Sequence, residues 1–208
     1  PVLLVLLGAG LGWSDAAAQE EPPSFLGDRA AVGSVAPEFT LKDLQGREHS
    51  LAALRENQPV VLVTGSYSCP IYRSRLAALN QLHERYSDRV AFFVLYTVEA
   101  HPQGSDSPYA DREWLTLQNR QEGILVEQPA DYSARAALAG QAQVKLGSQV
   151  PVLVDTLDNA TWLAYGSAPN AAFLIDSQGL LKSRQDWFKP ATLERKIVEL
   201  LQEEPARW

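Results

Sequence analysis

The sequence predicts an α/β fold, a central mixed β-sheet flanked by helices, and three patterns carry that prediction. Residues 59–64 and 90–96 are apolar runs without polar alternation, which is typical of strands buried on both faces. Between them, apolar residues recur at helical spacing after Pro70. A further apolar run at 171–176 is followed by a turn and a short strand, which indicates an antiparallel hairpin. A strand, a helix and a second strand in this order favour a parallel pair at the centre of the sheet.

The other elements follow from local patterns in chain order. In the helix after Pro70, Tyr72, Leu76, Leu79, Leu82 and Tyr86 are predicted to face the core. The order of elements resembles that of thioredoxin-like domains, so we expect a thioredoxin-like fold. The remaining predicted elements are an extended pair at 36–47, a short helix at 50–54, helices at 109–122 and 130–146, a strand at 150–155, and a closing helix at 190–202.

The start of the chain differs from the rest in composition. Residues 1–13 are an uncharged apolar run, and residues 14–18 lead into the small-residue step that ends a secretory signal. We expect residues 1–18 to be a signal peptide truncated at its start and cut between Ala18 and Gln19. Residues 19–34 are expected to be a flexible linker and residues 35–208 the folded domain. The protein is therefore predicted to be exported, periplasmic or extracellular. The alternative is an uncleaved membrane anchor at the same place.

Composition limits the partners. The chain has 208 residues, 46% of them hydrophobic, which suits one domain with a sizeable core. Its formal net charge of -7 disfavours binding to nucleic acid. No phosphate-binding or dinucleotide glycine pattern occurs, and no His, Cys and Asp residues have metal-ligand spacing. We expect neither a bound cofactor nor a metal.

Cys69 is the single cysteine of the sequence, and it lies where the strand at 60–64 gives way to the helix. A helix N-terminus favours negative charge and lowers the pKa of a thiol, and Pro70 is welcome in a first turn. Ser66 and Ser68 carry hydroxyls that could donate to a thiolate. These features predict a nucleophilic thiol with a pKa below its free value. The alternative is a packed cysteine beside two helix-capping serines.

The residues around Cys69 limit the reactions that its thiol can perform. Tyr72 stands where a C-x-x-C motif would have its resolving cysteine, so exchange within one dithiol is excluded. A one-cysteine peroxidase pattern, P-x-x-x-[ST]-x-x-C, finds Leu62 in place of its proline but Ser66 at its second position.

Three segments resemble the iodothyronine deiodinase family, over about residues 58–201. They are 65–76 (GSYSCPIYRSRL), 96–102 (YTVEAHP) and 152–156 (VLVDT), followed by Asn159, Tyr165, Pro169 and Gly179. The resemblance places Cys69 at the family's selenocysteine and Arg75 in its R-L pair. It implies reductive dehalogenation of a small molecule, an external thiol reductant and a homodimer. From thioredoxin-like folds it also implies that Pro169 lies beside Cys69 with a cis peptide bond.

The chain departs from the family's pattern at three places. Tyr67 replaces a nearby cysteine, a position near Asp106 replaces a tryptophan, and residues 117–120 lack a second histidine. In the family those residues help to hold an iodinated phenol.

Glu99 and His101 follow the second predicted strand. The carboxyl ends of neighbouring parallel strands open onto one crevice, so we expect both residues near Cys69. His101 is suited to move a proton, and Glu99 to orient the imidazole or pass the proton on. The alternative is that Glu99 caps the loop and His101 is exposed.

We therefore expect a thiol oxidoreductase with Cys69, His101 and Glu99 as catalytic residues. Ser66, Ser68, Pro70, Arg75 and Pro169 are the predicted supporting residues. Two other functions remain open: a one-cysteine peroxidase that passes through a sulfenic acid, and a catalytically silent binding domain.

Overall fold

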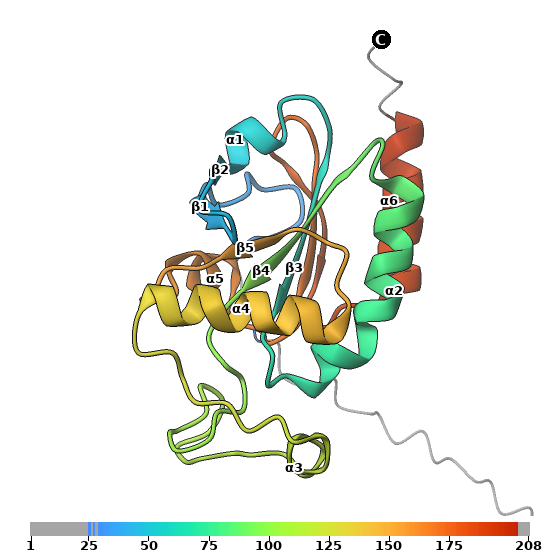
Figure 1. The fold of residues 1–208 in the computed structure, drawn as a ribbon. Helices are drawn as coiled ribbons and strands as arrows, with labels where there is room; N and C mark the ends of the chain where they lie inside the picture. The colour runs from blue at the N-terminus through green and yellow to red at the C-terminus, as the bar shows by residue number, and fades with distance from the viewer. Residues whose placement is uncertain (1–24, 26, 28, 204–208) are drawn as a thin grey trace, which may run out of the picture.

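One mixed sheet forms the centre of the molecule (Figure 1). The computed structural model describes residues 25, 27 and 29–203, and within them the strand order is β2-β1-β5-β4-β3-β6-β7. β3, β4 and β5 run parallel, whereas β6 pairs with β3, and β1 with β5, in the antiparallel sense. The predicted mixed sheet is confirmed. Its strands are β1 (Thr40–Asp43), β2 (Glu48–Ser50), β3 (Val60–Gly65), β4 (Ala91–Tyr96), β5 (Val152–Val154), β6 (Ala172–Ile175) and β7 (Leu181–Gln185).

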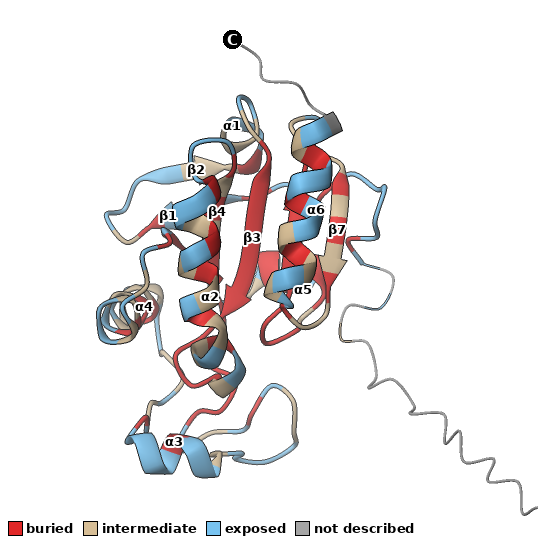
Figure 2. Cartoon of the chain, turned by 90° about the vertical axis from the view of Figure 1, so that its right-hand side faces the viewer, coloured by how far each residue is buried: buried red, intermediate tan, exposed pale blue. Residues whose placement is uncertain are grey.

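Alternate residues of the central strands point into two layers of core. Val61 and Val63 of β3 face a cluster that includes side chains of α2, α4 and α6. Val60 and Leu62 face a second cluster that includes side chains of α1 and α5. Both faces of β3 are therefore covered, and Figure 2 shows it buried along its whole length. The helices are α1 (Leu51–Leu54), α2 (Pro70–Tyr86), α3 (Leu117–Glu122), α4 (Tyr132–Leu146), α5 (Ala160–Tyr165) and α6 (Pro190–Glu203).

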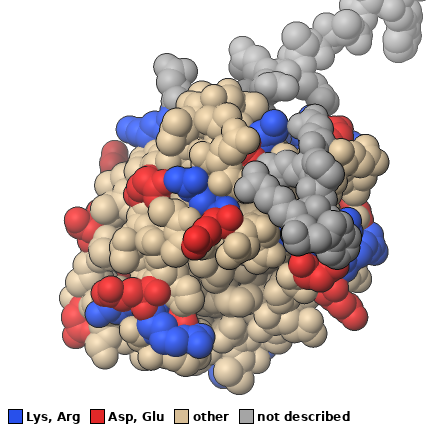
Figure 3. All heavy atoms as spheres, turned by 90° about the horizontal axis from the view of Figure 1, so that it is seen from above, with Lys and Arg blue, Asp and Glu red and all other residues tan. Residues whose placement is uncertain are grey.

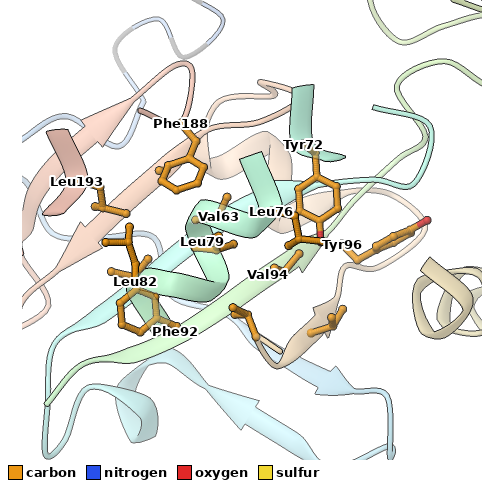
Figure 4. Close-up of a cluster of buried hydrophobic side chains, with 14 of the residues drawn as sticks. Val63, Tyr72, Leu76, Leu79, Leu82, Phe92, Val94, Tyr96, Phe188 and Leu193 are labelled. Atoms are coloured by element: carbon orange, nitrogen blue, oxygen red, sulfur yellow. The ribbon is translucent and has the colours of Figure 1, made fainter. Parts of the chain in front are cut away.

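α2 carries the candidate nucleophile at its start and is held by an apolar stripe. All five residues predicted to face the core are buried: Tyr72, Leu76, Leu79, Leu82 and Tyr86. Figure 4 shows the first four directed toward side chains of β3 and β4, among them Val63 and Val94. Each buried side chain of this size stabilises the fold by roughly 1.5–3 kcal/mol relative to exposure, so the start of α2 is fixed against the sheet.

The connection between β4 and α4, residues 97–131, forms a layer of loops below the sheet in Figure 1. The predicted helix at 109–122 is wrong over its first half, because α3 begins only at Leu117. There the Thr116 side chain accepts a hydrogen bond from the backbone N–H of Asn119 and caps the helix. α5 was not predicted, since its six residues are too few to show a helical period.

The N-terminal segment packs beside β7. The backbone N–H of Gly33 donates to the carbonyl oxygen of Leu181, whose own N–H donates to Ser34. The end of the expected linker, residues 33–34, is therefore hydrogen-bonded to β7. The expected signal peptide, residues 1–18, and its cut between Ala18 and Gln19 lie outside the described residues.

The described residues contain no helix with the length and apolarity needed to cross a membrane. On the face seen in Figure 3, Lys and Arg side chains are interspersed with Asp and Glu.

Candidate active site

Cys69 lies at the junction that the sequence predicts. It is the N-cap residue of α2, and its Sγ accepts a hydrogen bond from the backbone N–H of Tyr72 at 3.4 Å. Pro70 occupies the first turn, where no intrahelical donor is lost. The Cys69 side chain is only 1% exposed. The thiol therefore points into the protein, against the first turn of the helix.

Gly65, the last residue of β3, has a steric reason to be glycine. A Cβ atom there would lie 2.4 Å from the Tyr72 ring, well inside van der Waals contact. Tyr72 thus packs directly over the end of the strand, and this close approach fixes the turn from β3 to Cys69.

Two loops are joined at the carboxyl ends of β3 and β4. The Ser66 hydroxyl accepts a hydrogen bond from the backbone N–H of Ala100 at 3.2 Å, and the Ser68 hydroxyl accepts one from His101 at 2.9 Å. In the reverse direction, the backbone N–H of Ser68 donates to the Glu99 carboxylate at 2.7 Å. The two serines therefore fasten the loop after β3 to the loop after β4. Neither hydroxyl donates to the Cys69 sulfur among the contacts of the described chain.

Glu99 is fully buried between these loops. The Tyr96 hydroxyl donates to its carboxylate, and the backbone N–H of Tyr67 donates to that hydroxyl at 3.2 Å. The Gln128 amide pairs with both the N–H and the carbonyl of the Glu99 backbone, at 3.0 and 2.8 Å. Burial raises the pKa of the Glu99 carboxyl, and its hydrogen bonds offset only part of that rise. Glu99 is therefore set to retain a proton at a higher pH than an ordinary glutamate.

His101 is also buried, at 8% exposure. Its Nδ1 lies 3.0 Å from the carbonyl oxygen of Trp114, and the Trp114 ring meets the imidazole edge-on with centroids 4.5 Å apart. A carbonyl only accepts, so Nδ1 carries the hydrogen and Nε2 is the basic nitrogen. Burial lowers the pKa of His101, which favours this neutral form. The expectation that Glu99 orients the ring is wrong: the Trp114 carbonyl does so.

Arg73 and Asn119 support the Cys69 loop from below, and sequence reasoning missed both. Arg73 donates to the carbonyl of Tyr67 at 2.8 Å and to the Asn119 side chain at 2.7 Å, and Asn119 donates to the carbonyl of Ser68 at 2.8 Å. Asn119 is one of the residues that stand where the family has a histidine. The sequence does hold one signal that could have found Arg73. Arg73 lies one helical turn after Cys69, and this position puts a cation beside the nucleophile.

Arg75, the arginine singled out from the sequence, has a different environment. Its Nη1 is buried without a hydrogen-bond partner in the described chain. Burial lowers the pKa of Arg75, and an ionised Cys69 would raise it, so the guanidinium lies within electrostatic reach of the thiol. This arrangement favours negative charge on Cys69.

The pKa of Cys69 itself departs from the sequence prediction. Burial raises it, and the lowering by the backbone N–H groups of Tyr72 and Ile71 and by the Arg73 charge does not compensate. The predicted fall in pKa is therefore wrong for this closed arrangement. The helix N-terminus acts in the expected direction, but exclusion of water outweighs it.

The segment around Pro169 lies against the end of β3. The carbonyl of Ala168 accepts from the Thr64 hydroxyl at 3.1 Å, and Asn170 donates to the Thr64 carbonyl at 3.0 Å. The predicted cis bond is wrong, because the Ala168–Pro169 peptide is trans. The chain turns instead at Ser167, whose φ of 45° is left-handed.

Two further residues escaped prediction. Tyr109 is partly buried and packs against the core cluster that contains Cys69. Arg135, 3% exposed, donates to the Thr156 carbonyl at 2.5 Å and lies within electrostatic reach of Glu99. Both come from segments that are distant from Cys69 in sequence, so local patterns could not connect them with the site.

The family comparison and the curated relatives agree on one family. The family described as iodothyronine deiodinase matches residues 24–187. Thyroxine 5-deiodinase of Sparus aurata is 33% identical over 152 residues, covering 70% of this chain and 51% of the relative. The Ovis aries enzyme of the same name is 30% identical over 155 residues, covering 72% and 48%. The chain spans about half the length of these curated relatives.

Solved structures share the fold at low identity. The thioredoxin domain of a thiol-disulfide oxidoreductase from Bacteroides vulgatus gives a TM-score of 0.54 at 17% identity, covering 79% of this chain and 96% of that one. A secreted disulfide oxidoreductase of Mycobacterium tuberculosis gives 0.52 at 16% identity, covering 78% and 96%. The chain has a thioredoxin-like fold and belongs to the iodothyronine deiodinase family.

Proposed function

We propose that this protein is a thiol-dependent oxidoreductase in which Cys69 reduces an iodinated phenol or a related aryl halide. The observation that carries the proposal is the double fastening of the Cys69 loop to the loop of Glu99 and His101, through Ser66 and Ser68. A nucleophile and two proton-carrying groups are thereby held on one rigid support.

The proposed reaction begins with loss of the Cys69 proton to Nε2 of neutral His101. The thiolate sulfur then bonds to iodine as the carbon–iodine bond breaks, and the electron pair of that bond remains on the ring carbon. That carbon takes a proton, for which Glu99 is the reservoir because burial raises its pKa. The ring carbon is reduced by two electrons, and the sulfur is oxidised to a sulfenyl iodide.

An external thiol completes the cycle, since Cys69 is the single cysteine of the chain. The first thiol displaces iodide, releases a proton and leaves a mixed disulfide on Cys69. A second thiol attacks that disulfide, releasing the external disulfide and restoring the Cys69 thiol with its own proton. The proton that His101 took from Cys69 returns to Glu99, so both groups regain their starting states. The net change is one aryl iodide and two thiols converted to the arene, hydrogen iodide and one disulfide.

The family membership and the secreted thioredoxin-like neighbour support two further parts of the proposal. We propose that the protein is exported and that it forms a homodimer. Sequencing the N-terminus of the exported protein and measuring its mass in solution would test these two parts separately.

The chemistry is tested by exposing the reduced protein separately to 2-iodophenol and to hydrogen peroxide, with Cys69→Ser as the matched control. Released iodide and intact protein mass are measured in each case. Iodide release by the wild type and not by Cys69→Ser supports the proposal. A gain of one oxygen atom from peroxide without iodide release would show a peroxidase instead, and inertness to both would show a binding domain.

A further inference from the structure

A cavity of about 360 Å³ lies between the loop after β4 and helix α5, and it has no role in the reaction described above. Its walls are aromatic: Phe25, Tyr109 and Trp162 contribute to its lining. Tyr109 meets Trp162 edge-on with centroids 6.2 Å apart, and meets Phe25 in the same way at 5.6 Å. The indole Nε1 of Trp162 donates to the carbonyl of Ala168 at 3.0 Å, which fixes that wall. Aromatic edges and faces arranged in this way suit a flat aromatic ligand.

The cavity is connected to the Cys69 loop by a chain of contacts. Its lining residue Ser107 donates to the carbonyl of Ala100 at 2.8 Å, and the N–H of Ala100 donates to Ser66. Its lining residue Tyr109 packs against the core cluster that contains Cys69. Tyr109 therefore lines the cavity and also packs against the core cluster to which Cys69 belongs.

Cys69 needs such an entrance, because a thiol that is 1% exposed cannot meet a substrate without some movement. The pKa of Tyr109 is raised by burial and, in second place, by the charge of an ionised Cys69, so the two side chains are electrostatic neighbours. The Tyr109 side chain is held by ring contacts on the cavity side, and these can be exchanged for contacts with a ligand ring.

The charge of the lining restricts the ligand. Among the described residues that line the cavity, Asp111 is the charged one, and it is exposed at the rim. A carboxylate on the ligand would be repelled there, whereas an ammonium group would be attracted.

We propose that this cavity is the entrance to Cys69, that it binds a neutral or cationic aromatic molecule, and that the Tyr109 ring is the gate between that molecule and the thiol. The inference rests on the proposed function in taking Cys69 as the reacting group. Its tests measure access and binding without turnover, so a protein that releases no iodide still answers them.

The gate is tested by the rate at which neutral iodoacetamide alkylates Cys69 at a fixed alkaline pH. Tyr109→Ala is expected to be alkylated at least about tenfold faster than the wild type. The matched control Tyr109→Phe keeps the ring and is expected to stay close to the wild-type rate. Equal rates for Tyr109→Ala and the wild type would overturn the gate, as would an equal acceleration in Tyr109→Phe.

The ligand class is tested on the folded wild type by titrating tyramine and 3-(4-hydroxyphenyl)propionate, which differ in the sign of their charge. Tyramine is expected to bind about threefold more tightly, the scale of one exposed ion pair. The preference should disappear in Asp111→Asn, and Ala110→Trp, which fills the cavity from its rim, should abolish binding of tyramine. Tighter binding of the propionate, or undiminished binding of tyramine to Ala110→Trp, would overturn the proposed ligand site whether or not Tyr109→Ala folds.

Discussion

Two buried carboxylates occupy opposite kinds of environment. Asp43, on the β1–β2 hairpin, accepts hydrogen bonds from Arg47 and His49 side chains and from two backbone N–H groups. Glu99, in the loop after β4, accepts from a tyrosine hydroxyl and a backbone N–H, and within the described chain it has no ion pair. Both residues are less than a tenth exposed.

Their pKa values move in opposite directions. For Asp43, burial acts to raise the pKa, but the hydrogen bonds from His49 and Arg47 outweigh it and hold the pKa well below its usual range. For Glu99, burial prevails and raises the pKa. The difference shows that burial alone does not decide ionisation; the number and charge of the donors do. Asp43 is a structural anion, whereas Glu99 is suited to exchange a proton.

The largest expected effect comes from Glu99→Gln. The amide keeps the size and a hydrogen-bonding oxygen but cannot supply a proton, so turnover should fall about 10²- to 10⁴-fold. Asp43→Asn is the matched control and should leave turnover unchanged. Turnover is measured as the rate of iodide release. An equal loss of turnover in Glu99→Gln and Asp43→Asn would contradict the distinction between the two carboxylates.

His101→Ala should lower turnover by about 10²-fold or more, because it removes the imidazole that is proposed to take the Cys69 proton. Thermal unfolding should change little, since the backbone N–H that binds Ser68 is retained. Full activity in this variant, with any substrate that Cys69 accepts, would show that His101 has no part in proton transfer.

Asp43→Asn should lower the free energy of unfolding at pH 7 by about 1–2 kcal/mol, since it weakens charge-assisted hydrogen bonds whose Arg47 partner is largely exposed. Urea unfolding measures the loss. Glu99→Gln should instead raise the free energy of unfolding under the same conditions, because above the unfolded-state pKa of a glutamate the wild type loses stability to the release of this proton on unfolding.

Asp43→Asn and Glu99→Gln should also change the pH dependence of the free energy of unfolding, the first at acid pH and the second at higher pH. Because folding lowers the pKa of Asp43, its ionised form stabilises the protein at a pH above the unfolded-state pKa, and this stability is lost as the pH falls through the folded-state pKa. Asp43→Asn should therefore flatten the stability profile at acid pH. The raised pKa of Glu99 means that the folded state binds more protons, so stability declines as the pH rises through that value. Glu99→Gln should remove this decline. Urea midpoints from pH 3 to 9 would show both changes, and identical profiles would contradict the assignment.

Much of this fold could be predicted because its patterns are local. The buried stripe of α2 and the apolar runs of β3 and β4 appear in consecutive residues, and each is found where it was expected. The same reasoning brought Cys69, Glu99 and His101 to one edge of the sheet. Their carboxyl-end positions follow from the strand directions alone.

The inner contacts of the site could not be predicted in this way. Asn119 meets Ser68 across 51 residues, and Gln128 meets Glu99 across 29, so no periodicity links them. The wrong direction for the Cys69 pKa has a related cause. Helix position is local and visible in the sequence, whereas the exclusion of water depends on long-range packing.

The most direct test of the account is the protonation state of Glu99 at pH 7. Infrared difference spectra of wild type and Glu99→Gln, recorded from pH 4 to 9, would follow the carbonyl band of a protonated carboxyl, with Asp43→Asn as the control. The account predicts that the wild type keeps this band at a pH above the usual range of glutamate and that only Glu99→Gln loses it. A band that titrates near pH 4.3, the ordinary value, or that persists in Glu99→Gln, would contradict the account.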